Sequence, residues 1–291
     1  MSKKAFLDKN TKDLQGKTVA ISGATGGIGR ELCKLLARNN AEIILIDRNK
    51  EKQNLLIDEI KNLFPSVKIE GVIADMESID DVKSTVEYLL QKPVFALILN
   101  AGAYSIPRHK TSVGYDNVFT INFISPYYMA RRLLPHIKAN NGRIIAVGSI
   151  AHNYSKTDEQ DIDFSTRKRA SEVYGNAKRY LTYSFFDLAK RGEPTVIAHP
   201  GITFTGITAH YPKLIFAIIK HPMKVIFMKP EKAALSIYYG LFHTPKDSSW
   251  IGPSFFDIWG LPKEKVLKTA DSNERERIAS VADEIYKSLE K

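Results

Sequence analysis

The sequence predicts a single α/β domain, a doubly wound parallel sheet of about seven strands with helices on both faces. Short apolar runs alternate with longer segments in which apolar residues recur at helical spacing. The first apolar run leads directly into a glycine-rich turn and then into an amphipathic segment. This alternation is typical of parallel sheets whose strands are connected by helices.

The composition fits a globular domain in a reducing compartment. Of the 291 residues, 44% are hydrophobic and 25% are charged, which is ample material for a buried core. The single cysteine, Cys33, excludes an internal disulfide and lies in an apolar helical pattern, as a core residue would. We therefore expect a cytoplasmic protein. The seven histidines show no metal-ligand spacing, so we expect no metal site.

Several other classes of protein are disfavoured. No apolar run approaches the roughly 18 residues of a membrane-spanning helix, and the polar start Met1-Ser2-Lys3-Lys4 is unlike a signal peptide. The net charge of +10 would suit a nucleic acid or an anionic membrane. Because the basic residues are spread along the chain, and Arg167-Lys168-Arg169 is typical of a solvated loop, we expect no nucleic-acid partner. The pattern leaves both a monomer and an oligomer open.

The first half of the chain predicts four strands. Residues 1–16 are expected to form a charged extension ahead of one domain that spans 17–291. Ser78 precedes Asp81 by three residues, which predicts a capped helix start. The expected strands are 18–21, 42–46, 69–74 and 94–99, and the expected helices run from the glycine-rich turn to about Asn39, from Lys50 to Phe64 and from Ser78 onward.

The second half continues the alternation. Its expected strands are 144–147, 195–199 and 250–256, the last of the sheet. Its expected helices are 113–139, one that begins near Tyr174, one from Lys229 to about Phe242, and a last one at 274–289 capped by Asn273. The polar segment 152–169 is expected to form a flap beside a pocket.

The turn from Ser22 to Gly29 is expected to bind phosphate. Glycines let the backbone approach a pyrophosphate, and the N-terminus of the following helix attracts negative charge. Asp47 ends the next strand, where it can accept hydrogen bonds from both hydroxyls of an adenosine ribose. An aspartate that caps a turn is the alternative. After the fourth strand, Asn100-Ala101-Gly102-Ala103 places small residues where a cofactor ribose could approach the backbone.

Tyr174 and Lys178 are four residues apart and therefore share one face of a helix. An ammonium about 4 Å from a phenol contributes roughly 4 kcal/mol at an effective dielectric near 20. This would lower the tyrosine pKa by about 3 units, before burial acts in the opposite direction. Ser149, at the end of the strand 144–147, could bond the same substrate oxygen. Tyr88 and Lys92 repeat the spacing, but they precede a strand and so lie at the opposite edge of the sheet.

These motifs together resemble those of the short-chain dehydrogenase/reductase family, and the resemblance covers nearly the whole chain. The glycine-rich turn is similar to the family's TGxxxGxG motif, with Ser22 in place of threonine, and Asn100-Ala101-Gly102 to its NAG motif. Ser149 and the pair Tyr174 and Lys178 match its active-site serine and YxxxK. Residues 200–205 match the PGxxxT turn that borders the nicotinamide in that family.

The resemblance implies a Rossmann fold and roles for further residues. Asn122 matches a fourth catalytic residue that helps to hold a proton-relay water, and a polar residue that bonds its helix neighbours is the alternative. Asp75 matches the adenine contact. The implied catalytic residues are Asn122, Ser149, Tyr174 and Lys178. The implied cofactor contacts are Gly23, Thr25, Gly27, Ile28, Gly29, Asp47, Arg48, Asp75, Met76, Asn100, Ala101, Gly102, Tyr174, Lys178, Pro200, Gly201, Ile202 and Thr205.

Two departures from compact members of the family concern the substrate side. Twenty-four residues separate Ser149 from Tyr174, a longer crossing that is similar to that of retinol dehydrogenase-like members. The substrate lid that the resemblance places at about 206–229 is unusually apolar and carries Lys220, Lys224 and Lys229. This lid could dip into an anionic membrane interface. An apolar lid that packs on itself is the alternative.

The implied activity is hydride transfer between a nicotinamide dinucleotide and an alcohol or ketone, with an apolar substrate. Asp47 matches the acid of NAD-preferring members, and Arg48 the base of NADP-preferring ones. A carboxylate about 4 Å from a 2′-phosphate costs roughly 4 kcal/mol, whereas an exposed arginine–phosphate pair contributes on the order of 1 kcal/mol. NAD is therefore expected, with NADP as the alternative. The alternative functions are a non-catalytic dinucleotide sensor or scaffold, and a sugar-nucleotide epimerase or dehydratase, whose usual GxxGxxG turn this chain lacks.

Overall fold

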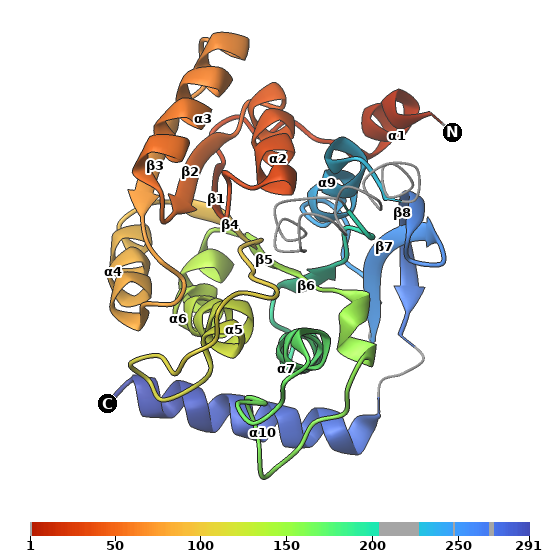
Figure 1. Ribbon diagram of the computed structural model, residues 1–291. Coiled ribbons are helices and arrows are strands. Elements are labelled where there is room, and N and C mark those ends of the chain that lie inside the picture. The colour runs from red at the N-terminus through yellow and green to blue at the C-terminus, as the bar shows by residue number, and fades with distance from the viewer. Residues whose placement is uncertain (1, 204–226, 247, 268–270) are drawn as a thin grey trace, which may run out of the picture.

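One sheet organises the protein. The structure is a computed structural model that describes residues 2–203, 227–246, 248–267 and 271–291. Its eight strands follow the order β3-β2-β1-β4-β5-β6-β7-β8 (Figure 1). All neighbours are parallel except β7 and β8, which are antiparallel. The strands are β1 Thr18–Ser22, β2 Glu42–Asp47, β3 Ile69–Ile73, β4 Val94–Leu99, β5 Arg143–Val147, β6 Thr195–Ala198, β7 Ser249–Phe255 and β8 Trp259–Val266.

The expected fold class is confirmed, but the prediction that 250–256 is the last strand is wrong. The chain turns after β7 and returns as β8, which contains Pro262 and the charged run Lys263-Glu264-Lys265. Proline and alternating charges are typical of edge strands, and they hide the apolar alternation on which strand prediction depends.

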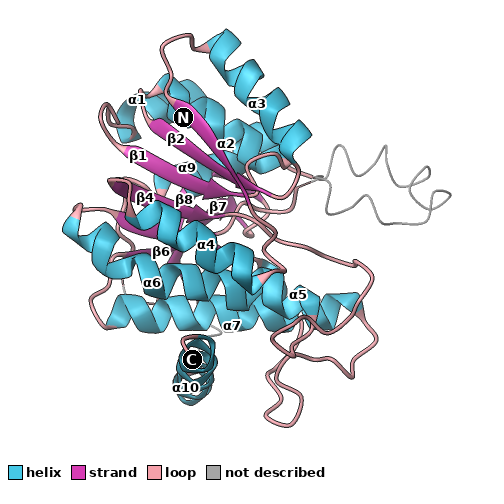
Figure 2. Ribbon diagram, turned by 90° about the vertical axis from the view of Figure 1, so that its left-hand side faces the viewer, coloured by secondary structure: helices cyan, strands magenta, loops and turns pink. Residues whose placement is uncertain are grey.

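Helices cover both faces of the sheet (Figure 2). They are α1 Lys3–Asn10, α2 Gly27–Arg38, α3 Lys50–Leu63, α4 Ile79–Leu90, α5 Asn117–Phe119, α6 Ser125–Ala139, α7 Ala170–Lys190, α9 Pro230–Tyr239 and α10 Ser272–Leu289. A π-helical turn, Thr120–Ile124, joins α5 to α6, and a 3₁₀ turn, Ile150–Asn153, follows β5. Asp271, not Asn273 as expected, caps α10 by accepting from the backbone of Asn273 and Glu274.

Successive strand residues face two separate cores, as period-2 alternation requires. Ile144 and Ala146 of β5 pack with α4, α6, α7 and α10, whereas Ile145 and Val147 pack with α2, α3 and α9. α10 lies outside α7, on the face away from the sheet, and forms a further layer there (Figures 1 and 2).

The N-terminal extension contains a helix. Ser2 caps α1 by accepting from the backbone of Ala5. Phe6 is buried, and its ring meets Tyr239 of α9 edge to face at 5.4 Å between centroids. The extension therefore packs on the body of the protein through Phe6, and Leu7 and the buried Leu14 add further apolar contacts.

Candidate active site

The glycine-rich turn connects β1 to α2 and is fastened to the end of β4. Ser22 Oγ accepts from the backbone of Asn100 and of Ala101, both at 3.1 Å. The Asn100 side chain donates back to the carbonyls of Ser22 and Gly23, at 3.1 and 2.9 Å. A serine hydroxyl makes these contacts as a threonine hydroxyl would. Two of the predicted cofactor segments therefore form one rigid unit.

Glycine is required at two positions of this turn. Gly23 has φ +67°, and a Cβ there would lie 2.8 Å from the Ala101 Cα. A Cβ on Gly29 would lie 2.3 Å from the Gly23 carbonyl oxygen, because the helix starts directly against the turn. Gly27 and Ile28 form the first turn of α2. The backbone here can lie close to a ligand, as the motif predicts.

Asp47 uses only one of its two carboxylate oxygens. Oδ1 accepts from the Thr25 backbone at 3.0 Å and from the Thr25 hydroxyl at 2.8 Å. Oδ2 is buried and has no hydrogen-bond partner among the described residues. Burial raises the pKa of Asp47, although the hydrogen bonds from Thr25 act to lower it. Oδ1 is thus bonded to the glycine-rich turn, while Oδ2 is a buried acceptor that no described residue uses.

The adenine side of the predicted site is more exposed. The Arg48 side chain is 69% exposed and lies 3.6 Å from the Asp75 carboxylate. Asp75 also accepts from the Glu77 backbone at 3.0 Å. The Met76 side chain is buried in the core. Arg48 is therefore engaged, weakly, with the predicted adenine contact.

Tyr174, Lys178 and Ser149 lie together at the carboxyl edge of the sheet. The Ser149 hydroxyl lies near enough to the Tyr174 phenol to act on its pKa. Lys178 Nζ donates to the Val147 carbonyl at 2.9 Å and lies 5.8 Å from the centre of the Tyr174 ring. Tyr104, which the sequence reasoning missed, meets the Tyr174 ring edge to face at 5.3 Å. The signal that could have identified Tyr104 in the sequence is its place as an aromatic residue two positions after Gly102.

The expected depression of the Tyr174 pKa is wrong for the protein alone. Burial raises the pKa of Tyr174 to about 12, although the Ser149 hydrogen bond acts to lower it. Burial also lowers the pKa of Lys178 to about 8. The sequence estimate assumed a separation of about 4 Å at the effective dielectric of a protein surface. In the structure, desolvation is the larger effect for both groups.

Asn122 lies in the middle of the π-helical turn. Its amide nitrogen donates to the carbonyls of Ala103 and Val118, both at 2.8 Å, and its oxygen accepts from the Ala103 backbone at 3.3 Å. A Cβ on Gly102 would lie 2.8 Å from the Asn122 oxygen and 3.8 Å from Lys178 Nζ. The predicted helix 113–139 is wrong at its start, because the first helical residue is Asn117. Asn122 bonds both its own helix and the segment after β4. π-helical turns are frequent at functional sites.

The turn after β6 closes the site on the side of β7 and β8. Gly201 has φ +84°, and a Cβ there would meet the Met228 side chain at 2.6 Å and the Ile258 carbonyl oxygen at 2.8 Å. Ile202 O accepts from the Met228 backbone at 2.8 Å. Thr205 and all but the last three residues of the predicted lid 206–229 lie outside the described residues.

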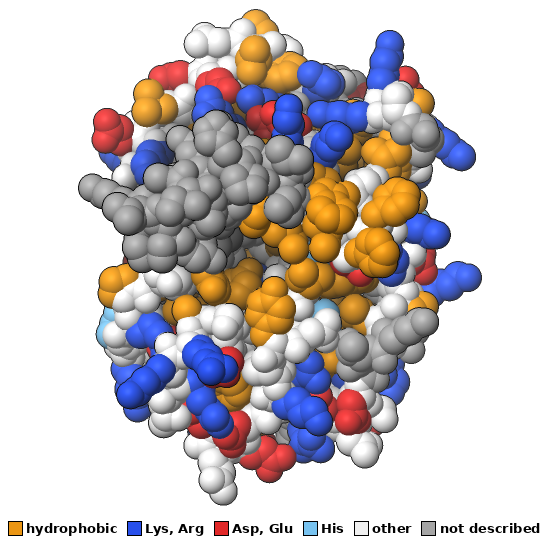
Figure 3. Space-filling view, turned by 45° about the vertical axis from the view of Figure 1, so that its right-hand side comes forward, with side chains coloured by type: hydrophobic (Ala, Val, Ile, Leu, Met, Phe, Trp, Pro, Cys, Tyr) orange, Lys and Arg blue, Asp and Glu red, His pale blue; other side chains and the backbone are white. Residues whose placement is uncertain are grey.

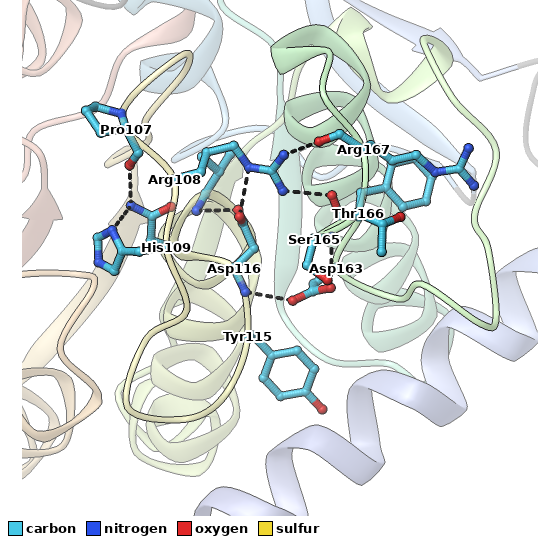
Figure 4. A network of polar contacts seen from close by, with 12 residues as sticks. Pro107, Arg108, His109, Tyr115, Asp116, Asp163, Ser165, Thr166 and Arg167 are labelled. Atoms are coloured by element: carbon cyan, nitrogen blue, oxygen red, sulfur yellow. Dashed lines mark hydrogen bonds and ion pairs between the residues drawn. The ribbon is translucent and has the colours of Figure 1, made fainter.

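The crossing segment 152–169 is anchored at several points (Figure 4). Arg108 pairs with Asp116 at 2.8 Å and donates to the carbonyls of Phe164, at 2.7 Å, and Arg167. Asp163 accepts from the Asp116 backbone at 2.7 Å. The predicted flap is thus tied to the loop before α5. Sequence reasoning could not find this network because its members are about 50 residues apart.

The described surface carries one further apolar feature beside the Gly201 turn. Phe255 and Phe256, at the β7–β8 turn, are 65% and 84% exposed. Figure 3 shows hydrophobic side chains gathered on the side where β7 and β8 lie. Over the described ranges, no helix is long and apolar enough to cross a membrane. The same residues contain no cluster of three or more histidine, cysteine, aspartate or glutamate side chains that could hold a metal ion.

Comparisons with known proteins agree with the motifs. The family model for short chain dehydrogenases matches residues 17–160. Short-chain dehydrogenase TIC 32 A, a chloroplastic protein of Brassica napus, is 28% identical over 81% of this chain and 79% of its own. Human polyprenol dehydrogenase is 24% identical over 84% and 74% of the two chains. Human retinol dehydrogenase 13 is 28% identical over 68% and 62%.

Solved structures share the fold. A protein of Mycobacterium paratuberculosis superposes with a TM-score of 0.70 at 20% identity, covering 95% of this chain and 94% of its own. An NAD(P)-dependent dehydrogenase of Beutenbergia cavernae with bound NADP superposes with a TM-score of 0.61 at 22% identity, covering 79% and 90%. At these identities the likeness concerns the fold alone.

Proposed function

Because the chain belongs to the short-chain dehydrogenase/reductase family of NAD(P)-dependent oxidoreductases, we propose that it interconverts an alcohol and a ketone with Tyr174 as proton donor and acceptor. The observation that carries the proposal is that the Ser149, Tyr174 and Lys178 side chains lie together, with Lys178 Nζ 5.8 Å from the centre of the Tyr174 ring and the Ser149 hydroxyl near enough to act on the Tyr174 pKa. Two hydroxyls at one point can bind a single carbonyl or alcohol oxygen.

The residues around this point fit a nicotinamide dinucleotide, which supplies or accepts the hydride when bound. The unpartnered Asp47 Oδ2 suits a ribose hydroxyl, and the turn at Gly23 and Gly29 leaves no room for a side chain beside a pyrophosphate. Pro200, Gly201 and Ile202 would border the nicotinamide, with Asn100 to Gly102 beside its ribose. The Lys178 ammonium, which donates to the Val147 carbonyl, retains donors for a ribose hydroxyl.

Proton transfer would occur at the Tyr174 phenolic oxygen. Ser149 would hold the substrate oxygen next to it. In reduction, the phenol gives its proton to the substrate oxygen; in oxidation, the phenolate takes it back. Asn122 would hold the segment after β4 in place where Gly102 lies near the ammonium of Lys178, supporting the route by which Tyr174 regains a proton.

We assign NAD(H) as the preferred cofactor because the buried Asp47 would face the 2′-hydroxyl of the ribose. A 2′-phosphate would face this carboxylate at a cost of roughly 4 kcal/mol. Arg48 is exposed and already pairs with Asp75, so its contribution to phosphate binding would be on the order of 1 kcal/mol.

The substrate proposed is apolar. Human polyprenol dehydrogenase and retinol dehydrogenase 13, which this chain resembles, are named for apolar alcohols. The exposed aromatics Phe255 and Phe256 lie on the turn that packs against Gly201, at the mouth of the site. We therefore assign this turn, together with the lid predicted at 206–229, to peripheral contact with an anionic membrane.

Incubation with NADH or NADPH and a panel of ketones tests the activity, because cofactor oxidation is followed by absorbance and the product alcohol is identified directly. The panel should run from short to long-chain ketones, and the long ones should react faster. Cofactor binding without turnover on any member of the panel would favour the sensor alternative. Conversion of a sugar nucleotide without net cofactor oxidation would favour the epimerase alternative.

A further inference from the structure

A buried ion pair joins the active-site helix to the C-terminal helix. Arg179 follows Lys178 on α7, and its side chain reaches Glu274 in the first turn of α10. Arg179 Nε donates to Glu274 Oε1 at 2.7 Å, and Nη2 contacts Oε2, so that the pair is bidentate. Both side chains are only 7% exposed. Figure 1 shows α10 running directly beneath α7.

The same two side chains hold the segment that follows Ser149. Arg179 Nη1 donates to the His152 carbonyl at 2.8 Å. Glu274 Oε1 accepts from the Thr157 backbone at 3.3 Å and from the Thr157 hydroxyl at 3.0 Å. The pair therefore contacts this segment at two points, on either side of Tyr154.

His152 continues the connection to Ser149. Its backbone donates to the Ser149 carbonyl at 3.1 Å, and its ring nitrogen Nδ1 lies 2.6 Å from the same oxygen. The His152 ring also packs edge to face on Trp250, at 5.4 Å. A continuous chain of contacts thus runs from Glu274 through Arg179 and His152 to Ser149.

A buried ion pair is a costly way to attach a helix. Taking two charges out of water costs several kcal/mol per ion. Apolar residues of similar volume in place of the pair often stabilise a fold equally well or better. α10 already has an apolar stripe against the body of the protein, formed by Ile278, Ala282, Ile285 and Leu289. The directional hydrogen bonds of Arg179 and Glu274 add what apolar contacts do not supply, a fixed position for the segment 149–157.

We propose that Glu274 and Arg179 are positioning residues that hold Ser149 in place beside Tyr174. The first turn of α10 is then part of the catalytic apparatus. This inference rests on the function proposed above. The competing explanation is that the Arg179–Glu274 ion pair only attaches α10 to α7 and has no effect on Ser149.

Asp283 provides a matched control on the same helix. It anchors α10 by an ion pair with Arg131, a hydrogen bond from the Tyr127 hydroxyl at 2.8 Å and a contact with Arg191 at 3.4 Å. Within the described ranges, no hydrogen bond or ion pair connects Asp283 to the segment 149–157. Glu274→Gln and Asp283→Asn each change one anchoring carboxylate of α10 to an amide, and only the first changes the support of Ser149.

The first measurement is kcat for both variants with the ketone that the parent reduces. Glu274→Gln should lower kcat by at least about tenfold, because displacement of a positioned group by a fraction of an ångström already slows the reaction. The Kd for the dinucleotide should stay within about twofold, and Asp283→Asn should keep kcat within about twofold. Equal losses of kcat in the two variants would overturn the proposal.

The second measurement does not depend on turnover. Trp259→Phe leaves Trp250 as the single tryptophan of the chain, and the His152 ring packs against it. In this background, Glu274→Gln should increase acrylamide quenching of Trp250, and Asp283→Asn should not. Unchanged quenching in Glu274→Gln would overturn the positioning role, even in a protein that turns over no ketone. Increased quenching in a protein without turnover would leave the positioning of the segment intact and remove the proposed function.

Thr157→Val covers the case in which Glu274→Gln fails to fold, as judged by circular dichroism. This variant removes the Thr157 hydroxyl donor and leaves the Arg179–Glu274 pair in place. It should lower kcat by about threefold with little change in Tm. A Thr157→Val protein with the parent's kcat and the parent's Trp250 quenching would overturn the proposal.

Discussion

At the scale of single residues, burial dominates the acid–base chemistry of the site. Lys178 is buried and donates to the Val147 carbonyl, and burial lowers its pKa to about 8. Burial likewise raises the pKa of Tyr174 to about 12. The protein alone therefore keeps the phenol protonated near neutrality, ready to donate a proton.

This protonation state predicts opposite pH dependences for the two directions of the reaction. Ketone reduction needs the phenol, so its kcat should be constant between about pH 6 and 8. Alcohol oxidation needs the phenolate, which becomes more abundant as pH rises, so its kcat should rise by up to about tenfold per pH unit over the same range. Initial rates in both directions measure this. An oxidation rate that falls as pH rises would contradict the assignment of Tyr174.

Asp47 is expected to set the choice of cofactor. Asp47→Ala removes the repulsion of a 2′-phosphate while Arg48 stays, so the ratio of kcat/KM for NAD(H) over NADP(H) should fall by roughly a hundredfold or more. The measurement is kcat/KM with both cofactors in parent and variant. A parent that already prefers NADP(H) would mean that Arg48 outweighs Asp47.

Local motifs made some residues predictable and left others out of reach. Gly23, Asp47 and Tyr174 could be found because their chemistry and their position after a strand are written in short stretches of sequence. Glu274 could not, because its partner Arg179 is 95 residues away and only the packing of α10 brings them together. The pKa values were also out of reach, since burial depends on the whole fold.

At the scale of elements, the π-helical turn and the β7–β8 hairpin are the informative differences from the expected pattern. The helical periodicity around Asn122 does not distinguish a π-helical turn from an α-helix, and the contacts of Asn122 with Ala103 come from tertiary structure. At the hairpin, Phe256 and Asp257 have φ of +49° and +58°. Non-glycine residues adopt this left-handed region at a cost. Because the turn is built from such residues, the sequence lacks the asparagine–glycine pair that usually signals a hairpin.

The hairpin turn is expected to contribute to membrane contact. Phe255→Ser with Phe256→Ser should reduce co-sedimentation with vesicles rich in phosphatidylserine by several-fold, because two aromatic side chains no longer enter the interface. The matched control is Leu55→Ser with Leu63→Ser on α3, where two apolar side chains are 64% and 55% exposed. No binding by the parent, or equal losses in both variants, would refute this role of the hairpin.

At the scale of the whole molecule, the order of elements was predictable because strands and helices alternate regularly. The additions at the edges were not. α1 has little amphipathic character, and one buried residue, Phe6, attaches it to α9. β8 is an edge strand with charges and a proline, so neither addition has the periodicity that the sequence analysis used.

Residues 17–291 are expected to hold the complete catalytic unit. Removal of residues 2–10 should lower the free energy of unfolding by about 2 kcal/mol, the contribution of one buried phenylalanine side chain. Denaturant unfolding measures this. The kcat of the shortened protein should equal that of the full chain, because α1 packs on α9, away from Tyr174. A shortened protein that folds but has lost turnover would show that the extension belongs to the active site.

The central claim is that Tyr174 transfers the proton, and comparison of Tyr174→Phe with Tyr88→Phe tests it most directly. Tyr88 also has a lysine four residues on, with Lys92 Nζ 5.0 Å from its ring centre, but Tyr88 lies near the end of α4 and Lys92 just after it, at the opposite edge of the sheet. Tyr174→Phe should lower kcat by a hundredfold to ten-thousandfold, roughly, and leave dinucleotide binding intact, since only the proton donor is lost. Tyr88→Phe should leave kcat unchanged. A Tyr174→Phe protein that retains most of the parent's kcat would contradict the account.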